Sequence, residues 1–354
     1  MSSLGKKSHI ATATFLAVFT ALLLIATFYD LEISRVMTRF SLKEGDYYTS
    51  DIFANLFEAA GMLPRSLLAA FSAISIGWFL YRSYLHKAVR VLLFIGAACA
   101  ATYLLSDGVR DLILYPMRHM IAEDAEAALN AIDAMKPTVY AISYLVAGGS
   151  VSVALYATRR VSADTWRRLA FFAIAYFLIE YLSDALVSLL KGYVDRVRFR
   201  SMNSAYGQAV GGFDLYTRWY EVTDHADLLR ATPLLSYTDA FRSFPSGHTS
   251  AAGCSYALIL LIDCLDVRDK RAKAGLWILP CVWTGLTAMG RIVAGAHFMS
   301  DVLFGGTIPF VLTILVREIW FRRFRTIKEM FPFGKKKSLQ TPKRQPETQG
   351  ELPE

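Results

Sequence analysis

The sequence predicts an all-α protein, a polytopic bundle of about eight transmembrane helices with both termini in the cytoplasm. Three observations lead to this prediction. Hydrophobic residues make up 54% of the 354 residues, and the mean hydropathy of +0.35 exceeds that of ordinary soluble domains. Apolar runs recur along the chain at the length that spans a hydrocarbon core, roughly 20 residues. Loops rich in Lys and Arg alternate with loops that are not.

Each apolar run is interpreted as one span. Helices are favoured because barrel strands would alternate apolar and polar residues, whereas these runs are continuously apolar. The first run is long and lacks a cleavage site, which indicates a membrane anchor rather than a signal peptide. The third run is short for a span. In chain order the predicted spans cover residues 10–29, 66–84, 91–105, 138–157, 169–190, 246–265, 274–290 and 299–321.

The basic loops orient the bundle, because short loops rich in Lys and Arg stay in the cytoplasm. Basic residues precede the first run, fill every second loop after it and follow the last run. We therefore expect an integral plasma membrane protein (inner membrane in a bacterium) with loops 30–65, 106–137, 191–245 and 291–298 outside or in the periplasm. The net charge of +8 follows from this topology, and its dispersal over many loops argues against nucleic-acid binding.

This pattern divides the chain into three parts. Residues 1–165 hold the N-terminal spans and outer loops, 166–325 a membrane core, and 326–354 a basic polar tail that we expect to be disordered. The four cysteines lie in apolar runs without metal-ligand spacing, so they are interpreted as packing residues. Nothing in the sequence predicts the oligomeric state.

The sixth run opens with Pro245-Ser246-Gly247-His248, a pattern typical of a helix N-terminus. The first turn of a helix presents free N–H groups and the positive end of the dipole, which suit a phosphate. Gly247 lets an anion approach the backbone, Ser246 adds a hydroxyl, and His248 can give a proton to a leaving oxygen. The alternative is an ordinary capped helix with an interfacial histidine.

A second polar group follows the seventh run, where Arg291, His297 and Asp301 lie at intervals of six and four residues. On a helix, His297 and Asp301 would share a face, so that the carboxylate could hold one imidazole nitrogen and leave the other as a base or nucleophile. The planar guanidinium of Arg291 fits two phosphate oxygens. The alternative is that Asp301 caps the last span and His297 is a solvated loop residue.

A third group, Lys191 and Arg198, follows the fifth run, with Arg196 and Arg200 nearby. Alone it is weak, since a lysine that flanks a span often only extends toward the interface. All three groups nevertheless fall on the outer side of the predicted topology. A chance arrangement would scatter them over both sides.

These residues resemble the three signature motifs of the type-2 phosphatidic acid phosphatase family, whose general forms are Lys-x6-Arg-Pro, Pro-Ser-Gly-His and Ser-Arg-x5-His-x3-Asp. The similarity covers roughly residues 191–301. The sequence departs from the family pattern at two places: Phe199 stands where proline is usual and Gly290 where serine is usual. Both departures spare the charged groups.

The resemblance implies a chemistry for the site. His297, oriented by Asp301, would attack phosphorus to give a phosphohistidine, and His248 would protonate the leaving group before water releases phosphate. No metal or cofactor is implied, and the partner would be a phosphorylated lipid in the bilayer. The groups that would hold the phosphoryl oxygens are Lys191, Arg198, Ser246, Gly247 and Arg291.

The sequence leaves the substrate and two alternative functions open. Phosphatidic acid, phosphatidylglycerol phosphate, a polyprenyl pyrophosphate and lipid A all fit the implied chemistry. A lipid hydroxyl in place of water would make the protein a phosphotransferase. A remoter alternative is a lipid transporter that uses Glu180, Asp184 and Asp301 as intramembrane polar sites. Glu180 and Asp184 could also form a structural ion pair or a water-filled entrance. The long loop 192–245 is a candidate lid whose aromatic residues are interpreted as interface anchors.

Overall fold

The computed structural model describes residues 3–120, 125–222 and 240–323, and these residues form helices and loops without any strand. The predicted all-helical class is confirmed. The tail 326–354 lies outside the described residues. The long helices are α1 (Ser3–Thr38), α3 (Leu63–Tyr81), α4 (Lys87–Met120), α5 (Ala125–Thr158), α6 (Ala163–Val194), α12 (Lys270–Val293) and α13 (Met299–Val316). The short elements are α2 (Ile52–Ala60), α7 (Phe199–Asn203), α8 (Ala205–Ala209), η1 (Gly212–Leu215), α10 (Gly247–Gly253), η3 (Cys254–Ile259), α11 (Leu260–Cys264) and η4 (Arg317–Phe321).

Among the residues that the structure describes, seven helical segments are long and apolar enough to cross a membrane, so the chain is a multi-pass membrane protein. The predicted span 91–105, which is short for a membrane helix, is the apolar centre of the much longer α4. Polar residues continue that helix beyond the apolar run, where Arg110 Nη1 lies 2.9 Å from Asp107 Oδ1. The seven segments are Thr12–Thr38, Ile52–Tyr81, Lys87–Met117, Asp133–Thr158, Ala163–Asn203, Lys270–Val293 and Met299–Phe321.

The predicted span 246–265 differs from the other seven because it consists of three short helical pieces. It runs through α10, the 3-10 helix η3 and α11 in succession. At 1.5 Å per α residue and 2.0 Å per 3-10 residue these three pieces extend roughly 30 Å, about the thickness of a hydrocarbon core. The break falls where α13 approaches closely, since a Cβ atom at Gly253 would lie 2.5 Å from Pro309 Cγ. An eighth crossing therefore stays a prediction.

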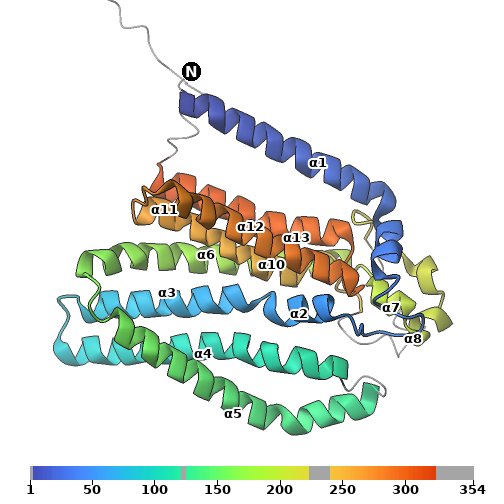
Figure 1. Cartoon of the computed structure of the whole chain (residues 1–354), viewed down its shortest axis with the longest axis horizontal. Coiled ribbons are helices and arrows are strands. Elements are labelled where there is room, and N and C mark those ends of the chain that lie inside the picture. The colour runs from blue at the N-terminus through green and yellow to red at the C-terminus, as the bar shows by residue number, and fades with distance from the viewer. Residues whose placement is uncertain (1–2, 121–124, 223–239, 324–354) are drawn as a thin grey trace, which may run out of the picture.

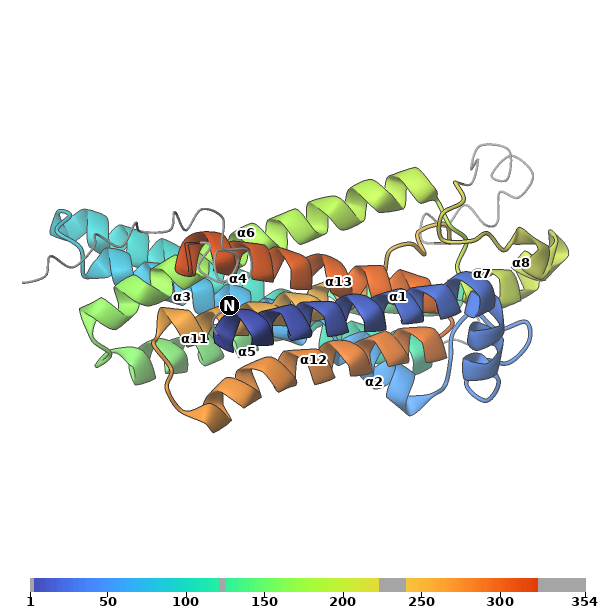
Figure 2. The same ribbon diagram turned by 90° about the horizontal axis from the view of Figure 1, so that it is seen from above.

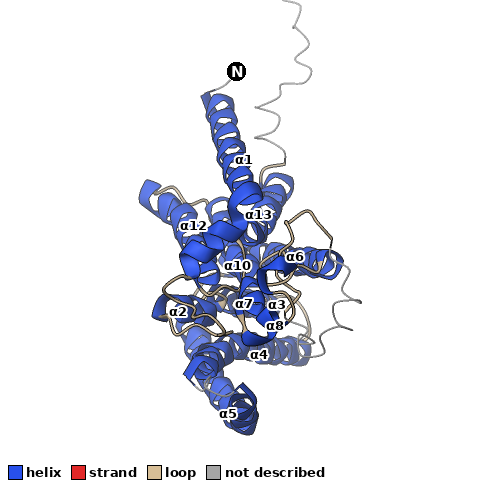
Figure 3. Cartoon of the chain, turned by 90° about the vertical axis from the view of Figure 1, so that its right-hand side faces the viewer, coloured by secondary structure: helices blue, strands red, loops and turns tan. Residues whose placement is uncertain are grey.

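The long helices lie side by side, with α1 inclined at the edge of the bundle (Figure 1). Turned by 90°, the bundle shows α13 between α6 and α12 (Figure 2). Seen end-on, α10 lies in the middle, among α3, α6, α12 and α13 (Figure 3). The loops of 82–86, 159–162 and 265–269 gather at one end, and the segments 39–51, 195–222, 240–246 and 294–298 at the other (Figure 1). All three polar motifs thus meet at the second end.

An apolar core packs helix α6 against the segment formed by α10, η3 and α11. Phe172, Tyr176 and Ile179 on α6 are fully buried and pack against Cys254 and Leu260 in the broken segment. Burying such side chains stabilises the fold by roughly 1.5–3 kcal/mol each. The same helix α6 carries Lys191 near its C-terminal end, so the packing of this core fixes the distance between two of the polar motifs.

Candidate active site

His297 lies in the loop between α12 and α13, with only 1% of its surface exposed. Its Nδ1 is 2.7 Å from the carbonyl oxygen of Ser243, and its Nε2 is 3.1 Å from Arg198 Nη1. A carbonyl oxygen only accepts a hydrogen bond, so Nδ1 carries the proton and Nε2 keeps its lone pair. Arg198 is held in turn by the Ala296 carbonyl, 3.0 Å away. The ring is therefore fixed in the tautomer that a nucleophile needs at Nε2.

Asp301 does not form the expected direct hydrogen bond with His297. Its Oδ2 is 3.7 Å from His297 Nδ1, whereas it accepts a hydrogen bond from Ser243 Oγ at 2.5 Å and another from the Phe298 backbone N–H at 2.8 Å. The i to i+4 geometry fails because His297 precedes the first residue of α13, Met299. Asp301 is linked to the ring through Ser243, and it also caps the start of α13, as the alternative interpretation expected.

A buried ion cluster lies behind Asp301. Arg196 donates from Nη1 to Asp301 Oδ1 at 2.7 Å and from Nη2 to Asp30 Oδ2 at 3.1 Å, and the three side chains are at most 1% exposed. Asp30 also accepts a hydrogen bond from the Ser300 backbone N–H at 3.0 Å. The guanidinium carbon of Arg196 lies 4.0 Å from the centre of the Phe298 ring. Two carboxylates thus share one arginine, and one of them comes from α1.

Arg291 is paired with a residue of α2. Its Nη1 lies 2.8 Å from Glu58 Oε1, and Arg200 Nη1 lies 3.8 Å from the same oxygen. Arg291 is 1% exposed and Glu58 3% exposed. Buried charges persist only when they are paired, so Glu58 is what allows a second arginine to stand behind the site.

Lys191 lies beside Gly247 of the Pro-Ser-Gly-His motif. Its Nζ donates a hydrogen bond to the carbonyl of Arg242 at 2.5 Å. A Cβ atom at Gly247 would be 3.7 Å from Lys191 Cε, an ordinary van der Waals contact. The structure therefore brings the end of α6 and the start of α10 together, although 55 residues separate them in the chain.

Ser246 caps α10, which confirms that the motif starts a helix. Its Oγ accepts hydrogen bonds from the backbone N–H of Thr249 at 3.3 Å and from the Thr249 hydroxyl at 3.0 Å. The Ser246 backbone N–H donates to the Asp301 carbonyl at 2.9 Å. A Cβ atom at Gly305 would lie 2.5 Å from the Ser246 carbonyl, so α13 presses directly on this turn.

His248 is the second residue of α10 and is half-buried. Its ring meets the ring of Tyr115 on α4 edge to face, with the centroids 5.4 Å apart. A contact of this kind holds the imidazole in place without using its nitrogens.

Positive charges surround His297. Burial is the main cause that lowers the pKa of His297 well below its usual 6.5, and the nearby charges of Arg198, Lys191, Arg291 and His248 lower it further, in that order. The imidazole is therefore neutral near pH 7, and its Nε2 lone pair accepts a hydrogen bond from Arg198. Four groups predicted from three separate motifs thus act on one ring.

Both departures from the family pattern have a structural reason. A Cβ atom at Gly290 would lie 2.8 Å from Phe57 Cβ, so α2 occupies the space that a serine would need. Phe199 is 3% exposed and packs its ring 5.0 Å from that of Phe213 and 6.4 Å from that of Phe298. Gly290 thus makes room for helix α2, and Phe199 adds apolar contacts around the loop of residues 294–298, which carries His297.

Three residues of the site were not predicted from the sequence: Asp30, Glu58 and Ser243. Asp30 ends the first apolar run and Glu58 stands alone in the apolar stretch of α2. Acidic residues in such places are costly unless paired, and this was the available signal. Within the described parts of the chain, no three His, Cys, Asp or Glu side chains are grouped to hold a metal ion.

The model of the PAP2 superfamily matches residues 169–325. Residues 169–325 are therefore similar to that superfamily. The resemblance drawn from the three motifs is thereby confirmed. The PAP2 region contains every predicted site residue, whereas Asp30 and Glu58 lie before it.

Three curated proteins show what the chain is similar to. It is 36% identical over 87 residues to phosphatidylglycerophosphatase B of Bacillus subtilis, covering 23% of this chain and 42% of that protein. It is 34% identical over 101 residues to a lipid A 1-phosphatase of Rhizobium etli (27% and 39%), and 31% identical over 100 residues to one of Rhizobium johnstonii (27% and 37%). The chain thus spans less than half the length of the curated relatives that it matches. No solved structure matches it.

Proposed function

We propose that this chain is a metal-independent lipid phosphatase that acts at the outer, periplasmic face of the membrane through a phosphohistidine intermediate. The main support is the state of His297, a buried neutral imidazole with its proton on Nδ1 and its lone pair on Nε2. Curated relatives named phosphatidylglycerophosphatase B and lipid A 1-phosphatase favour a lipid as substrate.

In the first step, the lone pair of His297 Nε2 forms a bond to phosphorus as the bond from phosphorus to the leaving oxygen breaks. His248, protonated beforehand, gives its proton to that oxygen. The Nδ1–H bond to the Ser243 carbonyl stabilises the positive charge that develops on the ring, with Asp301 3.7 Å away. The lipid alcohol leaves and the phosphoryl group stays on Nε2.

In the second step, His248 takes a proton from water, whose oxygen attacks the phosphorus atom. The N–P bond breaks, inorganic phosphate leaves, and His297 returns to its neutral form. Preorganised donors stabilise the charge on the three phosphoryl oxygens in both steps. We assign that role to the side chains of Lys191, Arg198 and Arg291 and to the N-terminal turn of α10 at Ser246 and Gly247.

The position of the site suits a substrate that remains in the bilayer. The loop between α12 and α13, which carries His297, lies at one end of the bundle (Figure 1). The apolar helices beside it extend to that end. Acyl or prenyl chains can stay among these helices while the head group reaches His297. The basic loops gather at the opposite end, which supports an outward-facing site.

The test is phosphate release by the purified full chain from a panel of phosphatidic acid, phosphatidylglycerophosphate, lipid A and a polyprenyl pyrophosphate. His297→Ala is expected to lower the rate by roughly ten-thousand-fold or more. His86→Ala, at an exposed loop on the opposite end, is the matched control and should keep full activity. Wild-type rates in His297→Ala would overturn the proposal. Transfer of labelled phosphate to a second lipid, without free phosphate, would make the protein a phosphotransferase instead.

A further inference from the structure

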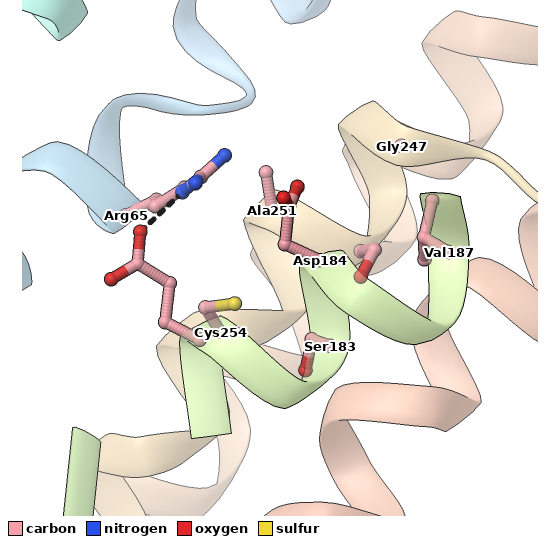
Figure 4. A pocket seen from close by; sticks show the side chains of 9 residues that line it. Arg65, Ser183, Asp184, Val187, Gly247, Ala251 and Cys254 are labelled. Atoms are coloured by element: carbon pink, nitrogen blue, oxygen red, sulfur yellow. Dashed lines mark hydrogen bonds and ion pairs between the residues drawn. The ribbon is translucent and has the colours of Figure 1, made fainter. Parts of the chain in front are cut away.

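A polar pocket opens beside the Pro-Ser-Gly-His motif, between α3, α6 and α10 (Figure 4). The pocket is shallow and open, and the 240 Å³ of free space around its lining includes open solvent. Gly247 forms one wall, so the pocket adjoins the place assigned to the phosphate. The side chains that give it chemical character are those of Arg65, Glu180, Ser183 and Asp184.

Arg65 and Glu180 form an ion pair across the pocket. Arg65 Nε donates to Glu180 Oε1 at 2.7 Å, and the side chains are 36% and 15% exposed. The backbone carbonyl of Arg65 accepts a hydrogen bond from the buried Tyr176 hydroxyl at 2.7 Å, which fixes the start of α3 against α6. Arg65 lies outside the PAP2 region, so this half of the pocket is supplied by the N-terminal part of the chain.

Asp184 differs from Glu180 because it makes no hydrogen bond or ion pair with any residue that the structure describes. Its side chain is exposed, lines the pocket and lies within electrostatic reach of Arg65 (Figure 4). An ionised carboxylate in a largely apolar span is costly. A hydrogen-bond donor on a bound molecule would offset that cost.

The depth of the pocket relates it to the substrate. Asp184 precedes Lys191 by seven residues on α6, which is two helical turns, so the two residues share a face about 10 Å apart along the axis. Glu180 lies one turn deeper. A lipid whose phosphate sits between Lys191 and Gly247 would place the group next to its phosphate at this level, on the way to its apolar chains.

On the basis of the proposed function, we infer that the pocket of Arg65, Glu180 and Asp184 is a head-group subsite for lipids whose phosphate is attached to a hydroxyl-bearing glycerol or sugar. The hydroxyl would donate to Asp184, and ester or ring oxygens would accept from Arg65. The three side chains carry a net charge of −1, which repels a second phosphate joined directly to the first. The subsite thus favours glycerol- and sugar-linked phosphomonoesters over polyprenyl pyrophosphates.

The experiment compares kcat/KM of wild-type protein and Asp184→Asn on four lipids. Phosphatidylglycerophosphate and lipid A 1-phosphate carry the hydroxyl-bearing group, whereas phosphatidic acid and undecaprenyl pyrophosphate do not. Asp184→Asn should lower kcat/KM for the first two by roughly tenfold more than for phosphatidic acid. It should raise relative activity on the pyrophosphate. A ratio between two lipids does not depend on the amount of folded enzyme.

Asp214→Asn is the matched control, because Asp214 is exposed and lies outside the pocket, and it should leave these ratios unchanged. An equal loss on all four lipids in Asp184→Asn, or a wild-type preference for the pyrophosphate, would overturn the subsite while leaving the phosphatase intact. No phosphate release by wild-type protein from any of the lipids would instead overturn the proposed function and this inference with it.

Discussion

The PAP2 region, residues 169–325, and the helices before it contribute different kinds of side chain to one site. The PAP2 region supplies every group that we place around the phosphate. The preceding helices supply the opposite charges: Asp30 of α1 binds Arg196, and Glu58 of α2 binds Arg291. The N-terminal part is thus more than a membrane anchor, because it balances the positive charge that the PAP2 region concentrates.

The two N-terminal contributions are built differently. Helix α1 lies at the edge of the bundle (Figure 1). From Thr12 onward most of its side chains are exposed, and Asp30 is among the few that are buried. Helix α2 packs closely on α12, where Trp283 Nε1 donates to the Gly61 carbonyl at 3.1 Å beside it. Removing either carboxylate therefore tests the same idea through a loosely held helix and a tightly packed one.

The largest effect is expected for Asp30→Ala. Arg196 would lose one of its two carboxylates, and the Ser300 N–H would lose its acceptor, all in a fully buried place. We expect the free energy of unfolding to fall by about 3–5 kcal/mol. Thermal or denaturant unfolding in detergent measures it.

Glu32→Ala is the control for this change, because Glu32 is an exposed carboxylate on the same helix. It should alter the unfolding free energy by no more than about 0.5 kcal/mol. If both variants unfolded at the same temperature as the wild type, the role given to α1 would be wrong.

A smaller effect is expected for Glu58→Gln, which keeps the shape of the side chain but removes its charge. Arg291 would be held less firmly, and kcat/KM for phosphate release should drop roughly tenfold. Glu44→Gln, exposed in the loop after α1, should behave as the wild type. Unchanged kcat/KM in Glu58→Gln would show that Arg291 needs no partner from α2.

The smallest effect concerns pH. The pKa of His297 is lowered by burial and then by Arg198, so the neutral imidazole persists below pH 6.5 and kcat/KM should fall only at more acidic pH. The stability gained from burying the neutral ring is complete above pH 6.5 and is lost as the pH falls.

Arg198→Gln removes one of the charges that lower the pKa of His297. The acid limb of the variant's pH–rate profile should therefore move to higher pH, even though the variant is slower. Arg39→Gln, exposed at the same end of the bundle, should leave the limb in place. A limb that does not move in Arg198→Gln would mean that the charge of Arg198 does not help to lower the pKa of His297.

Much of the fold could be predicted because a hydrocarbon core requires apolar runs of a fixed length. The same rule could not predict the 3-10 helix η3, since an apolar run looks alike in either helix and the approach of Pro309 to Gly253 is a tertiary contact. Nor could it place the ends of α4, because backbone hydrogen bonds carry that helix into a polar sequence.

The site was predictable in its residues but not in its connections. Charge alternation put Lys191, His248 and His297 on one side, and the structure brings them together at one end. Spacing suggested that Asp301 holds His297 directly, but the histidine precedes the helix and Ser243 stands between them. Asp30 and Glu58 were hidden because their partners lie 166 and 233 residues away along the chain.

Gly290 has a consequence for protein engineering. Because its missing side chain leaves room for Phe57, the matched region and helix α2 have become mutually dependent parts. A chimaera that joined these N-terminal helices to another PAP2 core with serine at this position would force the two backbones apart beside Arg291. Transplanting the PAP2 region into a new scaffold thus requires moving position 290 and α2 as a unit.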